Sequence, residues 1–141
     1  DAIRHAVEIE LGGRDFYAAA AEATHDHDLR DMFGRLAAME REHLDTLLRR
    51  YHLTAPDGAD GGLHRGMLQA GGHRDPGDPF DLLEMAITLE RRAEQFFRER
   101  IEATDGVARE LYRELAAEEG EHIDLLTTEL AAMRSNRRAL L

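Results

Sequence analysis

The two halves of the chain repeat one another, and this internal repeat limits the possible fold more than any other feature of the sequence. With an offset of 80 residues, Glu10 aligns with Glu90 and Tyr17 aligns with Phe97. Further along, the offset becomes 79 and the segment 36–43 aligns with 115–122. A one-residue difference of this kind is typical of a surface turn. Each half is therefore expected to form the same supersecondary unit.

Each half also shows the hydrophobic spacing of two amphipathic helices. Apolar residues recur at positions i, i+3, i+4 and i+7, which is the period of one helix face. The segments with this spacing are residues 1–24, 29–51, 79–103 and 107–133. Asp78 and Pro79 are a typical N-cap and first helical residue, so they mark the start of the third helix. Phe16 and Phe96 are expected to fill the core.

The segment between the halves determines how the two helix pairs are connected. Residues 52–78 hold most of the glycines, and a connection of this length is uncommon in a compact domain unless it crosses a bundle from end to end. Bundles with one long crossover are the ferritin-like arrangement. The sequence therefore predicts an all-α, ferritin-like four-helix bundle, a single domain over 1–141. Its antiparallel helix pairs would be 1–51 and 79–135.

Composition excludes several classes of partner. A net charge of −11 over 141 residues disfavours nucleic acid, which is bound through clustered Lys and Arg, and instead suits cations. No stretch reaches the roughly 20 apolar residues that a membrane span needs. The chain has no cysteine, which excludes disulfides and thiolate metal sites and makes the cytoplasm the expected compartment.

Two motifs appear once in each half of the chain. The first is a Glu seven residues before an aromatic residue, and the second is Glu-x-x-His. Seven residues drift only about 20° around a helix, and residues three apart share a face, so each motif presents its side chains on one side. The residues are Glu10, Tyr17, Glu40 and His43 in the first half and Glu90, Phe97, Glu119 and His122 in the second.

Together the motifs predict a site for two metal ions. Four Glu and two His that converge on a bundle axis provide six ligands, and bridging carboxylates can hold two cations close together. Glu40 and Glu119 occupy equivalent places in the repeat and are expected to bridge. Such donors accept Fe, Mn or Zn. Two alternatives remain: helix faces that coincide by chance, or a structural helical module whose site holds zinc or nothing.

Other Glu and His residues are expected to be surface charge. Glu22 and His25 also form Glu-x-x-His, but the repeat places Asp105 where a second His would be needed. Glu42 and Glu121 fall on other helix faces than the predicted ligands.

Over nearly its whole length, and through both copies of the motifs, the sequence resembles the ferritin-like domain of rubrerythrins. The resemblance implies two iron ions, with Glu10 and Glu90 as ligands from the first and third helices and the two Glu-x-x-His pairs from the second and fourth. Tyr17 matches a tyrosine that lies beside the metals in that family. Two features differ: the family's further Glu three residues after the third-helix ligand is Ala93 here, and the cysteine-rich rubredoxin segment has no counterpart.

The resemblance implies an oxidoreductase whose di-iron site reacts with peroxide or dioxygen, a peroxidase or ferroxidase. A peroxidase would take its electrons from an external donor. The alternative is ferritin-like iron oxidation, binding and handling without peroxidase turnover, which uses the same coordination. A homodimer is also expected, because an Ala-rich outer face such as Ala18–Ala21 can pack against a second copy.

Overall fold

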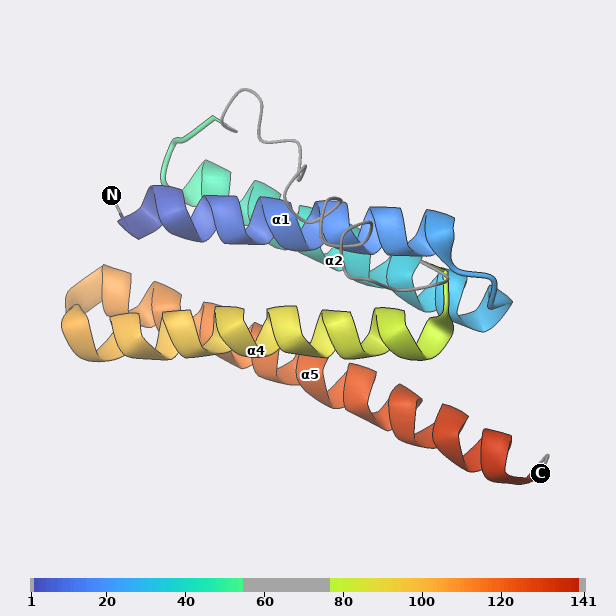
Figure 1. Cartoon of the computed structure of the whole chain (residues 1–141). Helices are drawn as coiled ribbons and strands as arrows, with labels where there is room; N and C mark the ends of the chain where they lie inside the picture. The colour runs from blue at the N-terminus through green and yellow to red at the C-terminus, as the bar shows by residue number, and fades with distance from the viewer. Residues whose placement is uncertain (1, 55–76, 140–141) are drawn as a thin grey trace. The chain divides into compact units, whose positions relative to one another are not determined.

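The computed structural model describes residues 2–54 and 77–139, which form four α-helices and no strand (Figure 1). This confirms the predicted all-helical class. The helices are α1 (Ala2–Ala23), α2 (His27–Arg50), α4 (Pro79–Ala103) and α5 (Gly106–Ala139). Most of the predicted crossover, residues 55–76, lies outside the described residues.

The chain divides into two structural units, residues 1–82 and 83–141. In the first, α1 and α2 are joined by a short turn and lie side by side, so they run antiparallel (Figure 1). In the second, α4 and α5 are joined in the same way. Both predicted helix pairs are therefore present.

Capping explains why α2 starts two residues before the position expected from periodicity. The backbone N–H of Leu29 donates a hydrogen bond to Oδ1 of Asp26 at 2.8 Å, which makes Asp26 the N-cap. The Arg30 guanidinium donates to the backbone carbonyl of Thr24 at 3.1 Å. These contacts hold the turn between α1 and α2.

The other end of α2 closes in a Schellman motif. The N–H of His52 donates to the carbonyl of Arg49 at 3.3 Å, and the N–H of Leu53 donates to that of Leu48 at 2.8 Å. His52 has a φ of 53°, in the left-handed region that usually takes glycine. Helix α2 therefore ends sharply although no glycine is present at this position.

Helix α4 begins at the predicted cap. The N–H of Asp81 donates to Oδ2 of Asp78 at 3.0 Å. Gly77, one residue earlier, lies against the α1–α2 turn: a Cβ built there would meet the carbonyl oxygen of Ala23 and would be 2.8 Å from Nε2 of His25. A residue with a side chain at position 77 would push this segment away from the turn.

A pair of aromatic rings lies in the core of each unit. In the first, the rings of Tyr17 and Phe33 are stacked with centroids 5.9 Å apart. In the second, the equivalent rings of Phe97 and Tyr112 have centroids 6.2 Å apart and an interplanar angle of 31°. Both units thus contain an equivalent pair of aromatic rings, but the tyrosine is on the first helix of one unit and on the second helix of the other.

The equivalent residues Phe16 and Phe96 differ in burial. Phe16 is 1% exposed, as expected for a core residue. Phe96 is partly exposed, and the Arg100 guanidinium covers its ring at 4.7 Å from the centroid. The expectation that Phe96 fills the core was therefore wrong, because a cation–π contact one turn along α4 covers the ring instead.

Two further expectations differ from the structure. Helix α5 continues to Ala139, since the sequence after Gly120 contains neither glycine nor proline to stop it. Within the segment Ala18–Ala21, Ala20 is fully buried and the other three alanines are partly exposed. This segment is therefore not a continuous outer face.

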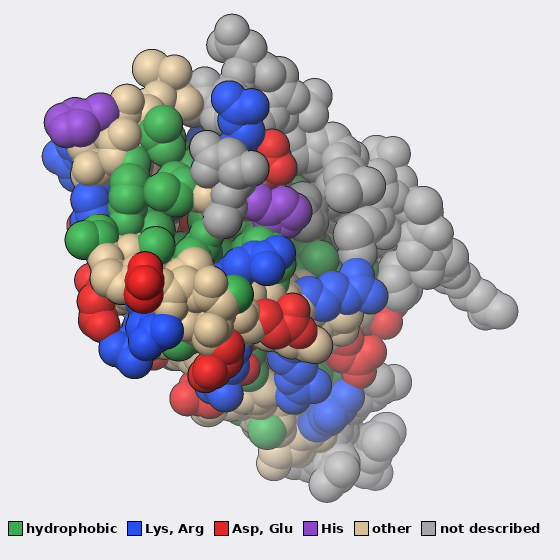
Figure 2. Space-filling view, turned by 90° about the vertical axis from the view of Figure 1, so that its left-hand side faces the viewer, with side chains coloured by type: hydrophobic (Ala, Val, Ile, Leu, Met, Phe, Trp, Pro, Cys, Tyr) green, Lys and Arg blue, Asp and Glu red, His purple; other side chains and the backbone are tan. Residues whose placement is uncertain are grey.

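The described helices include none with the combination of length and apolarity required to cross a membrane. On the face shown in Figure 2, acidic and basic side chains lie beside one another. On that face, the excess of acidic residues does not form one continuous patch.

Candidate metal centre

In the first unit, α1 and α2 bring together three of the predicted ligands. Each of these residues, Glu10, Glu40 and His43, offers one ligand atom. The three ligand atoms all lie within 4.8 Å of one another. Glu10 and Glu40 are 1% and 2% exposed, whereas His43 is only partly buried. We call these residues triad 1. Glu40 and His43 meet on one face because they are three residues apart in a helix.

The second unit repeats this arrangement with α4 and α5. Ligand atoms of Glu90, Glu119 and His122 lie within 4.8 Å of one another, and we call these residues triad 2. All three are buried, with exposed fractions of 5%, 3% and 1%. Unlike His43, His122 is thus enclosed completely.

Nδ1 of His122 lies 3.4 Å from Oε1 of Glu90, between α5 and α4. This separation is longer than the usual N–H···O hydrogen bond of about 2.7–3.2 Å. Two ligand atoms each about 2.1 Å from one metal ion, at tetrahedral or octahedral angles, are about 3.0–3.4 Å apart. The spacing of the two atoms therefore fits an ion pair and also fits two ligands of a shared ion.

Burial distinguishes the glutamates of the triads from the other glutamates near them in sequence. Glu42 and Glu121 are exposed, although each is only two residues from a buried glutamate. Glu22 and His25, the Glu-x-x-His pair without a repeat partner, are exposed as well. The predictions that these residues are surface charge are confirmed. Among the described residues, the buried glutamates are therefore those that the repeat selects.

The donor chemistry of both triads suits a cation. Two carboxylates and one imidazole are the donors that Fe, Mn and Zn accept. An ionised carboxylate buried away from water is costly unless a cation or hydrogen-bond donors compensate its charge. The described residues thus include buried groups of Glu and His that could hold a metal ion.

Tyr17 lies in the aromatic core of the first unit. It is 1% exposed, packs edge-on against Phe16 and stacks on Phe33. It follows Glu10 by two helical turns on the same face of α1. The expectation that its hydroxyl lies beside the metals stays a prediction.

Two residues of interest were missed by the sequence reasoning. Tyr112 is fully buried seven residues before Glu119. Its alignment with Phe33 in the repeat could have indicated that it belongs to the core.

The second is Gly13, which lies three residues after Glu10, on the same side of α1. A Cβ built at Gly13 would be 3.4 Å from Cδ of Glu40. The sequence carries no signal for that contact, because it depends on how α1 packs against α2.

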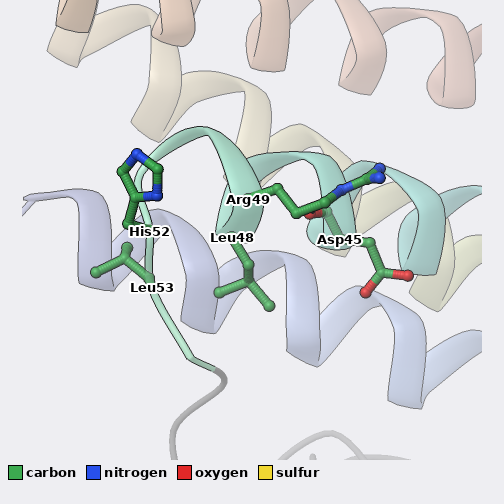
Figure 3. Close-up of a pocket in the computed structure, with 5 residues that line it drawn as sticks. All are labelled: Asp45, Leu48, Arg49, His52 and Leu53. Carbon is green, nitrogen blue, oxygen red and sulfur yellow. The ribbon is translucent and has the colours of Figure 1, made fainter.

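A surface pocket of the first unit lies at the C-terminal end of α2 and includes no residue of triad 1 (Figure 3). Asp45, Leu48, Arg49, His52 and Leu53 line it. Nε of Arg49 donates to the backbone carbonyl of Asp45 at 3.3 Å. The pocket therefore follows from the Schellman end of the helix and is separate from the candidate ligands.

The fold and the site together define an all-helical protein with buried Glu and His groups that can hold metal. In comparisons with known proteins, no family model, no curated protein and no solved structure matches the chain. The functional argument therefore depends on the triads and on the sequence pattern.

Proposed function

We propose that triads 1 and 2 join into one centre for two iron ions inside a ferritin-like four-helix bundle. The protein would be a rubrerythrin-like oxidoreductase that reacts with peroxide or dioxygen. The observation that carries the proposal is that each helix pair presents two buried Glu and one His whose ligand atoms lie within 4.8 Å of one another.

The ends of the long connection support the ferritin-like topology. The connection leaves α2 after the Schellman motif at Leu53 and returns at Gly77, which lies against the turn at the opposite end of the α1–α2 pair. Helix α2 has 24 residues, so these ends are separated by about 36 Å along the helix axis. A single long crossover accounts for this separation.

Charge supports a joined centre. Four carboxylates in their ionised, metal-binding form carry a charge of −4, which two divalent ions neutralise and one ion does not. The equivalent glutamates Glu40 and Glu119, each from a Glu-x-x-His pair, would bridge the ions. Glu10 with His43, and Glu90 with His122, would complete the two coordination shells.

Bound iron would supply the electrons and the open coordination position for the oxygen species. The chain itself would hold the ligands in place and exclude bulk water. Tyr17 and Tyr112 bury their rings on the helix faces that carry Glu10 and Glu119 and so help to close the site. His43 is the partly exposed ligand, which makes triad 1 the more accessible side. The remaining partners would be an external electron donor and a second copy of the chain.

The test is anaerobic loading with ferrous iron, followed by metal analysis and rapid mixing with peroxide or, separately, with dioxygen. We expect two iron ions per chain and faster oxidation by peroxide. Faster oxidation by dioxygen, with repeated uptake of ferrous iron, would support ferritin-like iron handling instead. The Glu42→Gln/Glu121→Gln protein is the matched control, since it loses two carboxylates outside the triads. A wild-type protein that binds no metal would contradict both functions.

A further inference from the structure

Glycine is unfavourable in the interior of a helix, so Gly13 in the middle of α1 requires an explanation. The explanation lies in what it faces. A Cβ at this position would be 3.4 Å from Cδ of Glu40, 3.5 Å from Oε2 and 3.6 Å from Oε1. These distances are ordinary van der Waals contacts, so a methyl group would fit the structure as it stands.

The three distances also show where the methyl group would lie. It would be nearest to the carboxylate carbon and almost equally far from both oxygens, which places it over the flat face of the group. Because residue 13 is a glycine, this position places no side-chain atom over that face of Glu40. The carboxylate otherwise lies in a closely packed environment, since Glu40 is 2% exposed.

The lack of a side chain at position 13 matters when the carboxylate turns. Rotation about the Cγ–Cδ bond moves an oxygen about 1 Å out of its present plane, because C–O bonds are about 1.2 Å long and leave that axis at an angle. A methyl group already in contact would then be far closer than the usual separation of about 3.5 Å. Alanine at position 13 would fit one orientation of Glu40 and obstruct the others.

We propose that Gly13 is a positioning residue of the di-metal centre, because the lack of a side chain at position 13 leaves the space that the Glu40 carboxylate needs to turn between binding one ion and bridging two. This inference rests on the proposed function, in which Glu40 is a bridging ligand. It assigns Gly13 a role in binding the second ion, whereas the first ion needs only one fixed orientation of the carboxylate.

The test is a titration with Co(II), whose visible absorption reports the coordination of each ion. The wild type, Gly13→Ala and Gly34→Ala are compared. Gly34 is a matched control, because it is also a glycine inside a helix but a Cβ there would meet nothing within 4 Å. Thermal melting of the metal-free proteins shows whether each variant is folded.

We expect the wild type and Gly34→Ala to bind two Co(II) per chain. Gly13→Ala should bind the first ion with unchanged affinity and the second at least about tenfold more weakly, with altered absorption for that ion. Its metal-free form should melt no lower than the wild type.

Two results would overturn the role of Gly13 while leaving the proposed function intact. One is equal binding of both ions, with an unchanged spectrum, by wild type and Gly13→Ala. The other is a Gly13→Ala protein that does not fold, because the methyl group would then be excluded even before metal binds. A wild type that binds fewer than two ions would instead overturn the proposed function, and this inference with it.

Discussion

Glu90 and His122 face one another between α4 and α5, with Oε1 of the carboxylate 3.4 Å from Nδ1 of the imidazole. Both side chains are almost completely buried. A protonated His122 could form an ion pair with Glu90, whereas a neutral imidazole would bind a cation together with it. The two interpretations predict different effects when the imidazole is removed.

The variant His122→Ala tests the cation interpretation. We expect the affinity for one of the two metal ions to fall at least about tenfold, since a ligand is lost, while the other ion still binds. His25→Ala is the control, because His25 belongs to the exposed Glu-x-x-His pair. Unchanged metal binding by His122→Ala, measured by calorimetric titration, would favour the structural ion pair.

Glu40 is expected to contribute to both coordination shells, so its loss should affect both ions. Glu40→Gln keeps the size of the side chain but removes its charge. Metal content after loading and desalting should fall from two ions per chain to one or none. Glu42→Gln removes a charge two residues away on the exposed side of α2 and should retain both ions. Two ions at full occupancy in Glu40→Gln would exclude a bridging role.

Metal removal should destabilise the protein at neutral pH. A ligand at 100 times its dissociation constant stabilises the folded state by about 2.7 kcal/mol, which corresponds to roughly 10 °C in Tm for a chain of this size. Protons compete with metal for carboxylate and imidazole, so this stabilisation is present at neutral pH and is lost as the pH falls. Melting curves of chelated and loaded protein should therefore converge in mild acid. Coincident curves at neutral pH would contradict a buried metal centre.

Tyr17→Phe tests whether the buried hydroxyl takes part in the reaction. The aromatic stack with Phe33 should survive, so metal content should stay at two ions and stability should fall by no more than about 1 kcal/mol. If the hydroxyl lies beside the metals, oxidation of the ferrous protein by peroxide should slow measurably in stopped-flow experiments. Tyr51→Phe, at the C-cap of α2, is the control. Equal oxidation rates for the wild type, Tyr17→Phe and Tyr51→Phe would show that Tyr17 is a core residue without a part in the reaction.

Gly77→Ala should destabilise the protein, because the new methyl group would collide with the α1–α2 turn. The expected loss is about 1–3 kcal/mol, the usual size of a strained or overpacked contact. Gly34→Ala should have the opposite sign and stabilise by about 0.5–1 kcal/mol, since its Cβ would meet no neighbour and alanine favours the helix. Urea unfolding followed by circular dichroism measures both. If Gly77→Ala and Gly34→Ala changed the free energy of unfolding equally, the segment before α4 would not be held against the turn.

Much of the candidate site could be predicted because its spacing is local to single helices. The faces shared by Glu40 and His43, or by Glu119 and His122, follow from helical geometry, whatever the helices pack against. The repeat then selected these pairs over Glu22 and His25, which the structure leaves exposed. The cap at Asp78 was predictable for the same reason, since its hydrogen bond reaches only three residues along the chain.

Residues at equivalent positions of the repeat differ where packing between helices decides their environment. His122 is enclosed and His43 is partly exposed, although both close a Glu-x-x-His pair. Phe16 is buried while Phe96 is partly exposed. The sequence by itself determined the four helices and the ligand-bearing face of each. Only the tertiary structure decided the burial of each residue and the contact of Gly13 with Glu40, because both depend on atoms brought together from distant positions in the chain.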